Sequence, residues 1–423
     1  NMFNGTGTAE IRLPYGFTIT SINNVYLNEF RYTNTVNPWF GQYASSNGMV
    51  TKEHDRTWSY NFQQRINWHQ TYGEHDIEVM VGHEYYRTRG YWLNNAMYNM
   101  FSFDNKELAG AIMPTGGTSY TSDYNTESWL SRAQYNYAER YFVSASYLRQ
   151  ASSRFDPDHW WGNFWSLGAG WLINKESWFK ASWVDELKLK ASYGENGNDN
   201  ISDLLYTTYY NVANSNDQVS LVPASLGNNE ITWEKNAKFN IGVDFSLFNG
   251  RLSGTAEFYS NKTKDMLSWF PLPTSYGWTG YYTNIGNMIN QGFEFSLSGD
   301  IIRTKDLTWS MYANMTTNHN EITMLAPERK TMHVDGVDGF SSSTYFYGEG
   351  ISRYTIYMPQ YAGVYYNADD PSDPENGKAM YYKNVYKTDA DGNMIYDQNG
   401  NPVIEGRTTT TDYGAADQYL CGD

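Results

Sequence analysis

The sequence predicts an all-β fold, a transmembrane, antiparallel, up-and-down β-barrel, and three observations support this prediction. Apolar and polar residues alternate with a period of two along many segments of the 423-residue chain. Many of these segments are long, whereas strands of soluble proteins average about five or six residues and a tilted strand needs roughly 9 to 11 to cross a bilayer. The connections between the segments alternate between short and long.

The alternation is clearest between Trp58 and Trp68. One parity holds Trp58, Tyr60, Phe62, Ile66 and Trp68, and the other holds Ser59, Asn61, Gln63, Arg65 and Asn67. Successive side chains of a strand point to opposite faces, so one face contacts lipid and the other faces the lumen. Arg65 must face the lumen, because the reverse register would place it in lipid at a cost of roughly 2 to 4 kcal/mol. Gln64 shares the lipid parity, and we expect it beside a polar group of a neighbouring strand or at a local bulge.

Similar segments predict about twelve strands. They lie near residues 6–13, 16–32, 53–70, 76–92, 126–138, 140–151, 161–173, 186–195, 232–247, 251–263, 290–302 and 306–320. We expect aromatic side chains of these strands to form girdles at the two membrane interfaces. The residues expected there are Trp58 and Tyr60 at the outer interface and Trp68 at the inner one, together with Trp165, Trp171 and Trp309.

The connections predict which end of each strand faces which compartment. Short connections lie at residues 13–16, 71–76, 138–140, 248–251 and 302–307, with a somewhat longer one at 174–186. Longer connections lie near 33–52, 93–125, 152–160, 196–231, 264–289 and 321–423. Because the two kinds alternate at every step, all the short turns lie at one end of the sheet. Outer-membrane barrels have this asymmetry, with short turns on the periplasmic side and long loops outside the cell.

The composition of the chain changes near residue 320. Residues 1–320 hold the predicted barrel strands and their loops. Residues 321–423 carry sixteen Asp/Glu and seven Lys/Arg, so more than half of the net charge of −16 lies in this last part. We interpret residues 321–423 as a long acidic extracellular loop region that contains a small hairpin. Because the chain begins at Asn1 without a signal peptide, we expect it to be a piece of a longer protein.

The composition also argues against several classes of function. A net charge of −16 disfavours nucleic-acid binding, which relies on stripes of Lys and Arg. The single cysteine, Cys421, allows neither an internal disulfide nor a cysteine-based metal site. No apolar run reaches the roughly 18 to 20 residues of a membrane-spanning helix. The seven histidines lack metal-ligand spacing and no Gly-x-Ser-x-Gly motif occurs, so we expect neither an enzyme nor a bound cofactor.

One segment resembles a calcium-binding loop. Asp389, Asp391 and Asn393 alternate in "DADGNMIYDQNG" as they do at the start of such a loop. However, Gly392 stands at the wrong offset and no Glu closes the loop, so a hairpin turn is the favoured interpretation. A loosely held external Ca²⁺ remains the alternative.

Aromatic residues in the long connections are candidates for binding sugars, because the apolar face of a sugar ring packs on an aromatic plane. The candidates are Trp39, Phe40, Tyr43, Tyr91, Trp92, Trp278, Tyr281, Tyr282, Tyr345, Phe346 and Tyr347. For any single one of them, the outer girdle or packing between loops is the favoured role. We nevertheless expect some of the set to line a substrate site.

Several strings together resemble the SusC/RagA family of TonB-dependent outer-membrane transporters. They are "ERYFVSASYLRQASSRFDPDHWWGNFWSLGAGWLINKESWF" from residue 139, "LKLKASYGENGN" from 187, "NNEITWEKNAKFNIGVDFSLFNGRLSGTAEFYSNKTKDML" from 228, "NIGNMINQGFEFSLSG" from 284, "YAGVYYNADDPSDPENGKAMYY" from 361 and the terminal "DQYLCGD". The resemblance covers nearly all of the chain from about residue 60 onward. One small departure is Gln150-Ala151, where the family often has Asp-Gly.

This resemblance implies a 22-stranded barrel closed by an N-terminal plug, of which about twelve strands lie in this chain. It implies a SusD-like surface lipoprotein as a lid, a dimer of such pairs as a possible assembly, and energy from the TonB–ExbB–ExbD complex. The plug and the TonB box would lie outside this chain. The implied location is the bacterial outer membrane, surrounded by its lipid, and the implied substrates are oligosaccharides.

Three alternative functions remain open on the sequence. The same machinery imports oligopeptides in some members, and the aromatic loops suit either substrate. A surface adhesin or glycan-binding scaffold that does not transport would carry the same long loops. A soluble glycan-binding β-protein would share the alternation of polar and apolar residues.

Overall fold

The structure of the protein, a computed structural model, describes residues 1–397 and 402–422 and is built almost entirely of β-strands. It divides into two units. The first comprises Asn1–Asn261, Asp265–Asn284 and Phe293–Thr316, and the second comprises Lys262–Lys264, Ile285–Gly292 and Thr317–Asp423. No helix within the described ranges has the length and apolarity to cross a membrane.

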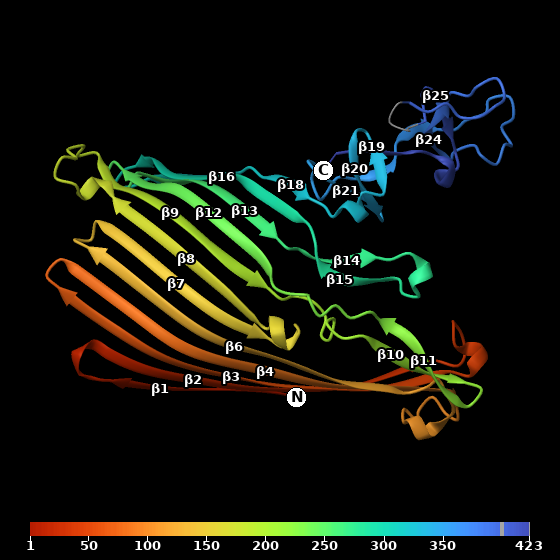
Figure 1. Cartoon of the computed structure of the whole chain (residues 1–423), viewed down its shortest axis with the longest axis horizontal. Coiled ribbons are helices and arrows are strands. Elements are labelled where there is room, and N and C mark those ends of the chain that lie inside the picture. Colours follow the sequence, from red (N-terminus) through yellow and green to blue (C-terminus); the bar gives the residue numbers. More distant parts are fainter. Residues whose placement is uncertain (398–401, 423) are drawn as a thin grey trace. The chain divides into compact units, whose positions relative to one another are not determined.

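One large sheet dominates the first unit, and its strands pair in chain order (Figure 1). The path runs through β1 (Met2–Arg12), β2 (Phe17–Val36), β3 (Met49–Tyr72), β4 (His75–Met100), β6 (Thr118–Tyr137), β7 (Tyr141–Ser152), β8 (Trp161–Leu172), β9 (Val184–Asn198), β12 (Glu234–Leu247), β13 (Leu252–Lys264), β16 (Asn287–Arg303) and β17 (Thr308–Thr316). Each predicted strand corresponds to one strand of this path, so the predicted antiparallel, up-and-down all-β fold is confirmed. Within the described residues the sheet stays open, with β1 and β17 at its edges.

Short and long connections alternate around the sheet, as predicted. The short ones join β1 to β2 through η1 (Pro14–Gly16), β3 to β4, β6 to β7, β8 to β9 through η5 (Ile173–Lys175), β12 to β13, and β16 to β17. They gather at one end of the sheet and the long connections gather at the other end, which lies to the right in Figure 1. The long connections carry η2 (Ala44–Ser46), η3 (Leu108–Gly110) with β5 (Ala111–Pro114), η4 (Pro157–His159), the hairpin of β10 (Tyr209–Ser215) and β11 (Gln218–Ser225), and the hairpin of β14 (Leu267–Pro271) and β15 (Gly280–Asn284), with η6 (Thr274–Tyr276).

Several strands extend farther than the sequence predicts. The β3–β4 ladder continues to the pair Met49↔Tyr98, so Tyr91 and Trp92 lie in a strand and not in a loop. The alternation of side chains fades there because both faces of a strand beyond the bilayer meet water, whereas the backbone pairing continues. The predicted strand 306–320 is also interrupted, since β17 ends at Thr316 and β18 (His319–Met324) pairs separately with β16.

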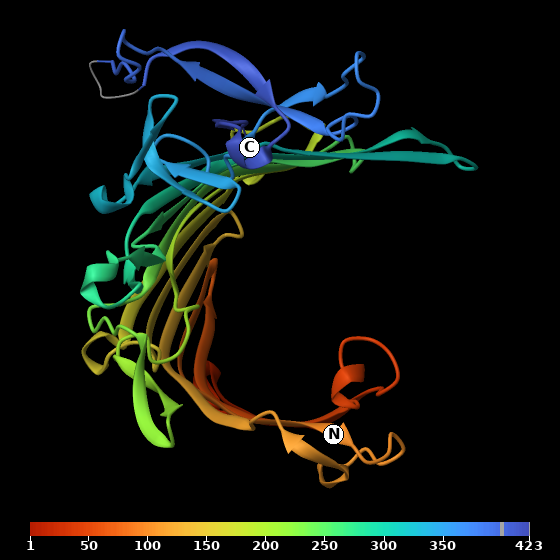
Figure 2. The ribbon, with the colours of Figure 1, turned by 90° about the vertical axis from the view of Figure 1, so that its right-hand side faces the viewer.

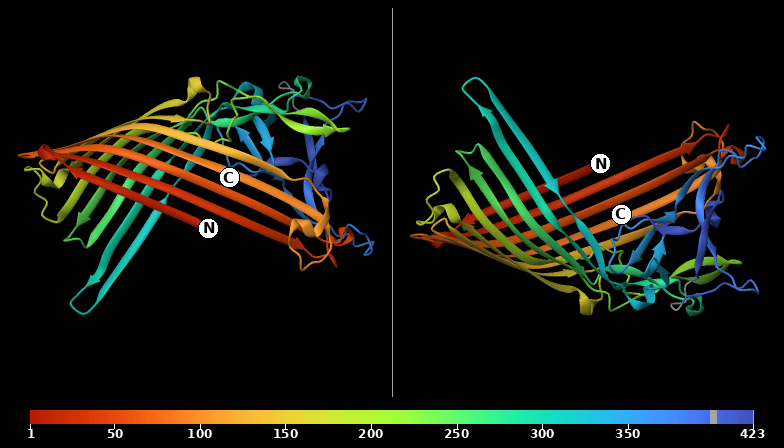
Figure 3. Two further views of the ribbon diagram at one scale, coloured as in Figure 1. Left: turned by 90° about the horizontal axis from the view of Figure 1, so that it is seen from below. Right: turned by 90° about the horizontal axis from the view of Figure 1, so that it is seen from above.

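The sheet is curved (Figures 2 and 3), and its two faces differ in how far their side chains are buried. On β3 the parity of Phe62 and Ile66 is the more exposed one, whereas Ser59 and Arg65 of the other parity are buried or half-buried. Side chains splay apart on the outer side of a curved sheet and crowd together on its inner side. The aromatic and aliphatic parity therefore lies on the convex face, and Arg65 lies on the concave face, as predicted for a lumen.

Apart from β18 and the adjoining ends of β13 and β16, the second unit consists of short strands in small sheets. They are β19 (Met332–Val334), β20 (Val337–Ser342) and β21 (Tyr345–Gly348) in one sheet, β22 (Tyr357–Pro359) and β26 (Gln418–Leu420) in another, and β23 (Tyr361–Val364), β24 (Ala379–Tyr386) and β25 (Ile404–Thr410) in a third. Two short helical turns, η7 (Pro327–Arg329) and η8 (Tyr413–Ala415), complete it. The fully buried Phe346 packs on Tyr357, with ring centroids 5.5 Å apart.

Candidate functional site

The connection between β2 and β3 presents two adjacent aromatic side chains, Trp39 and Phe40, which are 69% and 71% exposed. The side-chain oxygen of Asn37 accepts hydrogen bonds from the backbone N–H groups of both residues, each at 3.0 Å. This local turn orders the start of the connection. In Figure 2 the connection, drawn in red, turns toward the hollow side of the sheet of its own unit.

A small dry core, meaning a cluster of buried apolar side chains, lies where this connection meets the sheet. It consists of Val50, Met100 and Ala111. Asn47 donates a side-chain hydrogen bond to the backbone oxygen of Met100 at 3.0 Å. Gly48 follows with φ 78°, and a Cβ there would lie 2.9 Å from the backbone oxygen of Val36. Glycine is the residue that fits this left-handed, crowded position without strain.

Two further aromatic residues follow the end of β4, and one of them contacts Trp39. Phe103 meets Trp39 edge to face, with ring centroids 5.3 Å apart, and Phe101 is 92% exposed. The sequence analysis did not single out these two residues, although "MFSFDN" places both directly after the last residue of β4. We call Trp39, Phe40, Phe101 and Phe103 the aromatic shelf.

The other aromatic candidates do not form one surface. Tyr43 stacks on Tyr98 at 5.8 Å. Tyr91 and Trp92 are consecutive in β4 and therefore point to opposite faces, so they cannot line the same site. Trp92 donates a hydrogen bond to a carboxylate oxygen of Glu53 at 3.0 Å.

The candidates farther along the chain pack mainly against rings nearby. Trp278 lies 5.8 Å from Tyr210, Tyr281 lies 5.6 Å from Phe270, Tyr282 lies 5.2 Å from Trp269, and Tyr347 stacks on Phe340 at 5.0 Å. Phe346 is fully buried, and Tyr345 is 38% exposed. Burial leaves Phe346 no surface for a ligand, so its contacts support the alternative that the ring packs the connection.

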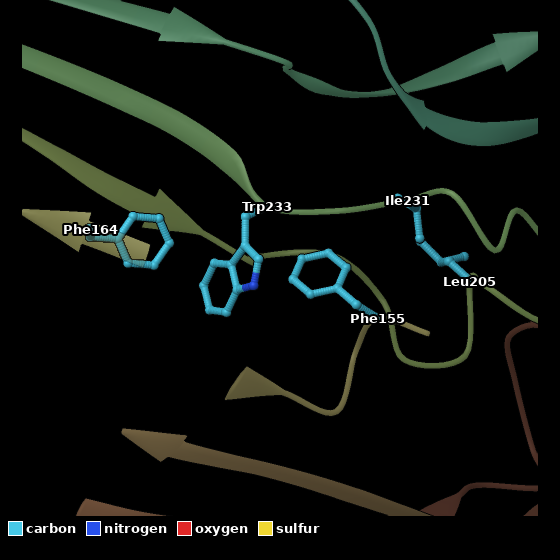
Figure 4. Close-up of a cluster of buried hydrophobic side chains, with 5 residues drawn as sticks. All are labelled: Phe155, Phe164, Leu205, Ile231 and Trp233. Carbon is cyan, nitrogen blue, oxygen red and sulfur yellow. The ribbon is translucent and has the colours of Figure 1, made fainter. Parts of the chain in front are cut away.

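A second dry core ties the later long connections together (Figure 4). It consists of Phe155, Phe164, Leu205, Ile231 and Trp233. The indole N–H of Trp233 donates to the backbone oxygen of Trp160 at 2.9 Å, and its ring lies 5.2 Å from Phe155 and 5.3 Å from Phe164. We call these five residues the anchor cluster, because it joins the β7–β8 connection to the β9–β12 connection.

A polar network centred on Asp199 adjoins the same connections. One carboxylate oxygen of Asp199 accepts hydrogen bonds from the hydroxyl of Tyr124 at 2.8 Å and from that of Ser152 at 2.6 Å. Arg154 donates to the backbone oxygen of Asp199 at 3.0 Å, and its guanidinium lies 4.3 Å from the centroid of the Tyr124 ring. The start of the β9–β12 connection is therefore fixed to β6 and β7.

The convex face carries the side chains expected at the girdles. Trp58 stacks on Tyr60 at 5.6 Å, and Trp165 packs against Tyr193 at 5.4 Å. At the end with the short turns, Trp68 donates to the backbone oxygen of Tyr15 at 3.1 Å, and Trp171 donates to Glu176 at 2.9 Å. Trp309 is 51% exposed on β17. The predicted partner of Gln64 is also present, because its side-chain N–H donates to Asn23 of β2 at 3.3 Å.

The concave face is polar and contains a recess of about 420 Å³ near the short turns. Gly168 and Gly170 of β8 contribute to its wall, and Lys188 and Lys190 of β9 lie beside them. Lys190 forms ion pairs with Asp244 at 3.0 Å and Glu257 at 3.1 Å. This face thus suits a polar interior, whereas the convex face suits an apolar surrounding.

The candidate calcium loop forms a turn. The carboxylate of Asp389 accepts backbone hydrogen bonds from Asp391 and Asn393, each at 2.9 Å, and the isolated bridge Thr388↔Met394 closes the turn. These bonds hold the pKa of Asp389 below its usual range. Over residues 1–397 and 402–422, no group of three His, Cys, Asp or Glu side chains could hold a metal ion. The contacts support the hairpin interpretation, and external Ca²⁺ binding stays a prediction.

Comparison with known proteins shows that the chain is similar to TonB-dependent receptors. The family described as "TonB dependent receptor-like, beta-barrel" matches residues 2–419. TonB-dependent receptor SusC of Bacteroides thetaiotaomicron is 32% identical over 393 residues, which cover 88% of this chain and 36% of that protein. TonB-dependent receptor P39 of Formosa agariphila is 31% identical over 353 residues, which cover 81% of this chain and 32% of that protein.

A solved structure with the same arrangement is that of the RagAB peptide transporter, with a TM-score of 0.81 and 26% identity. It is matched over 100% of this chain and 44% of the other chain. This chain thus spans well under half the length of each of these relatives, which are described as receptors or transporters and not as enzymes. The extent of the family match and the strand-by-strand agreement lead to one conclusion: the chain belongs to the TonB-dependent receptor-like β-barrel family and is similar to SusC and RagA.

Proposed function

We propose that this chain forms part of the barrel wall of an outer-membrane transporter that imports oligosaccharides in a TonB-dependent manner. The observation that carries the proposal is the difference between the two ends and the two faces of one sheet. An apolar convex face suits lipid, a polar concave face suits a hydrated passage, and the aromatic shelf stands at the end with the long connections. That end would face the cell exterior and meet the substrate first.

The aromatic shelf is the proposed first contact for the substrate. Trp39 and Phe40 offer exposed ring planes, and Asn37 orders the backbone that carries them. Sugars of many linkages present an apolar ring face, so such a shelf captures oligosaccharides without selecting one linkage. Selection would then fall to polar groups of the passage below.

A substitution of this pair tests the proposal directly. Replacing Trp39 and Phe40 together by alanine in the full-length protein should weaken oligosaccharide binding by at least about fivefold, because two stacking planes are lost. The chain offers a matched control, the adjacent pair Trp178 and Phe179, which lies in a connection at the opposite end of the sheet. Titration calorimetry against a panel of oligosaccharides should show loss in the first variant only. If the Trp39/Phe40 variant bound oligosaccharides as tightly as the Trp178/Phe179 variant, the aromatic shelf would not be a substrate site.

Transport itself requires a test in cells. Deleting the gene should abolish growth on at least one complex glycan and leave growth on its constituent monosaccharides intact. Unchanged growth over a broad panel of glycans and peptides would contradict the proposal. We also propose a SusD-like surface lipoprotein as the partner at the outer end, and co-purification of such a lipoprotein with the full-length protein would check this.

Peptide import is the second candidate. The observation that favours it is the likeness to the RagAB peptide transporter over the whole of this chain. An aromatic shelf binds aromatic and aliphatic peptide side chains as readily as sugar rings. Mass spectrometry of small molecules that co-purify with the protein separates the two candidates, because peptides and glycans differ in composition.

A further inference from the structure

The convex face carries a recess that neither transport nor the substrate site accounts for. It has a volume of about 370 Å³ and is lined by His54, Arg56 and Trp58 of β3 and by Arg89 and Tyr91 of β4, among others. The register pairs Arg56 with Tyr91 and Trp58 with Arg89, so these four side chains share the face of the outer aromatic residues. The recess lies on the side of Trp58 that is farther from the short turns.

Two arginines of this recess have no hydrogen-bonded or ion-paired carboxylate among the described residues. Among the described residues, neither Arg56 nor Arg89 forms a hydrogen bond or an ion pair, and Arg56 is exposed. The nearest carboxylates of the same face are already engaged. The carboxylate of Glu29 forms an ion pair with the guanidinium of Arg31 at 2.8 Å and lies 3.0 Å from Nε2 of His54.

A second carboxylate on this face, beside Arg89, is Asp123, which pairs with the guanidinium of Arg87. Asp123 lies directly opposite Arg89 in the β4–β6 register, yet its hydrogen bonds go to Arg87. The guanidinium groups of Arg56 and Arg89 therefore have no carboxylate hydrogen-bonded to them.

The two unpaired arginines are diagonal neighbours across β3 and β4. Arg56 stands opposite Tyr91, and Arg89 precedes Tyr91 by two residues on the same face. Such positions are roughly 7–8 Å apart, within reach of long side chains. Like charges at this separation repel each other, and an anion held between them removes the repulsion. Guanidinium groups bind phosphate through paired hydrogen bonds, which makes phosphate the anion that fits best.

The residues around the recess indicate whether this phosphate is a free ion or part of a lipid headgroup. Trp58, Tyr60 and Phe62 form a row of neighbouring rings on the convex face next to the recess, where the proposed function places the outer membrane interface. A free phosphate ion would gain nothing from this apolar border. A lipid headgroup would place its phosphate between the arginines and its acyl chains along the aromatic row.

We propose that Arg56 and Arg89 bind the phosphate of a phosphorylated glycolipid of the outer leaflet. Trp58 and Tyr91 border the site and offer ring planes to the headgroup sugar. The site would fix a lipid to β3 and β4 close to the aromatic shelf. This inference rests on the orientation given under the proposed function, with the long connections outside the cell.

The test uses the full-length protein in detergent and purified lipid A that carries phosphate. Native mass spectrometry should detect bound lipid A for the wild type and at least about tenfold weaker binding for the double variant Arg56→Gln and Arg89→Gln, since two charge-assisted contacts are lost. A double variant Arg12→Gln and Arg303→Gln removes the same number of charges from arginines that already have carboxylate partners. It should bind lipid A within about twofold of the wild type.

Further arms separate the possible sources of binding. Lipid A freed of its phosphate should bind about as weakly as the Arg56→Gln, Arg89→Gln variant does, and inorganic phosphate alone should compete poorly. Equal binding of the dephosphorylated lipid would overturn the proposal, and so would complete competition by inorganic phosphate. The variant Arg56→Lys, Arg89→Lys keeps both charges and should bind measurably. Heat-modifiable mobility on gels confirms that each variant is folded before its binding is compared.

The outcome is separable from that of the proposed function. Lipid A binding is measured without substrate, and transport is measured in cells. Intact transport by a protein that does not bind lipid A would remove this inference alone. Failure of all transport with intact lipid A binding would remove the proposed substrate role and leave the lipid site standing.

Discussion

The sheet and the anchor cluster hold their large apolar side chains in opposite ways. Along β3, Phe62 and Ile66 are 41% and 51% exposed, on the convex face. In the anchor cluster, Phe155 and Trp233 are 0% and 3% exposed. The same chain therefore builds one region for an apolar solvent and another for water.

The difference shows where folding energy comes from in each region. A soluble domain buries its apolar residues inside, as the anchor cluster does. A sheet with an apolar outer face gains that burial from lipid, and its backbone hydrogen bonds are satisfied between neighbouring strands. The long connections extend beyond the apolar layer and meet water, so they need small buried apolar cores of their own. Both dry cores lie at the end of the sheet that carries the long connections.

The largest expected effect is at Trp233. Replacing it by alanine should destabilise the joined β7–β8 and β9–β12 connections by about 3–5 kcal/mol, as for other buried tryptophans. The strands of the large sheet should remain intact, because the burial of their apolar residues does not depend on this core. Hydrogen exchange of the full-length protein should become faster in residues 199–233 and stay unchanged in β3 and β4.

The matched control is Trp183→Ala. Trp183 lies at the end with the short turns, is 52% exposed and stacks on Phe248 at 5.5 Å. Its loss should change stability by less than about 1 kcal/mol. If Trp233→Ala left the exchange of residues 199–233 unaltered, the anchor cluster would not be the element that orders these connections.

The second expected effect concerns the convex face. Ile66→Arg should destabilise the barrel by about 2–4 kcal/mol in lipid, because a guanidinium would enter the apolar layer. Gln63→Arg is the matched change on the concave face, where Glu84 accepts a hydrogen bond from Gln63 at 3.2 Å. That variant should cost less than about 1 kcal/mol. Urea titration of the protein folded into lipid vesicles, followed by gel mobility, measures both, and equal costs would contradict the assignment of faces.

Much of this two-sided sheet could be predicted from the sequence because strand periodicity is a local property. Trp58 to Trp68 and the short turn after Tyr72 carry their signals within a few residues. The hairpins β10–β11 and β14–β15 lack such a signal, since exposed hairpins outside the membrane have no apolar layer to enforce alternation. Membership of the anchor cluster was equally hidden, because Phe155 and Trp233 are far apart in the chain and meet only in the folded protein.

The candidate site was predictable only in part, for the same reason. Trp39 and Phe40 stand out as an aromatic pair in a polar connection, and the structure leaves both exposed. Phe346 has the same local appearance but is fully buried. Whether a loop aromatic packs inward or outward depends on residues distant in sequence, and periodicity carries no information about them.

A third, smaller effect is expected where the connections meet the sheet through Asp199. Asp199→Ala leaves the hydroxyls of Tyr124 and Ser152 without their acceptor, which should cost about 1–3 kcal/mol of local stability. Asp199→Asn keeps an oxygen acceptor and should cost less. Limited proteolysis of the β9–β12 connection in the full-length protein ranks the variants. Equal sensitivity of both variants and the wild type would show that the dry core alone orders this connection.

The smallest effect is expected in the second unit, at the partly exposed carboxylate of Glu349. The carboxylate of Glu349 accepts a hydrogen bond from the backbone N–H of Leu325 at 2.8 Å and forms an ion pair with Lys330 at 2.9 Å. Both interactions lower the pKa of Glu349. A carboxyl whose pKa is lowered by folding stabilises the protein above its unfolded pKa of about 4.3, and this contribution disappears as the pH falls through the folded value.

Local stability around residues 325–349 should therefore decrease between about pH 5 and about pH 3, by less than about 1 kcal/mol because solvent screens the pair. Glu349→Gln should remove this pH dependence, since the amide does not titrate there. Proteolysis of the full-length protein with an acid-active protease at several pH values measures it. An unchanged pH profile in the variant would mean that other carboxyls, and not Glu349, govern the acid response of this unit.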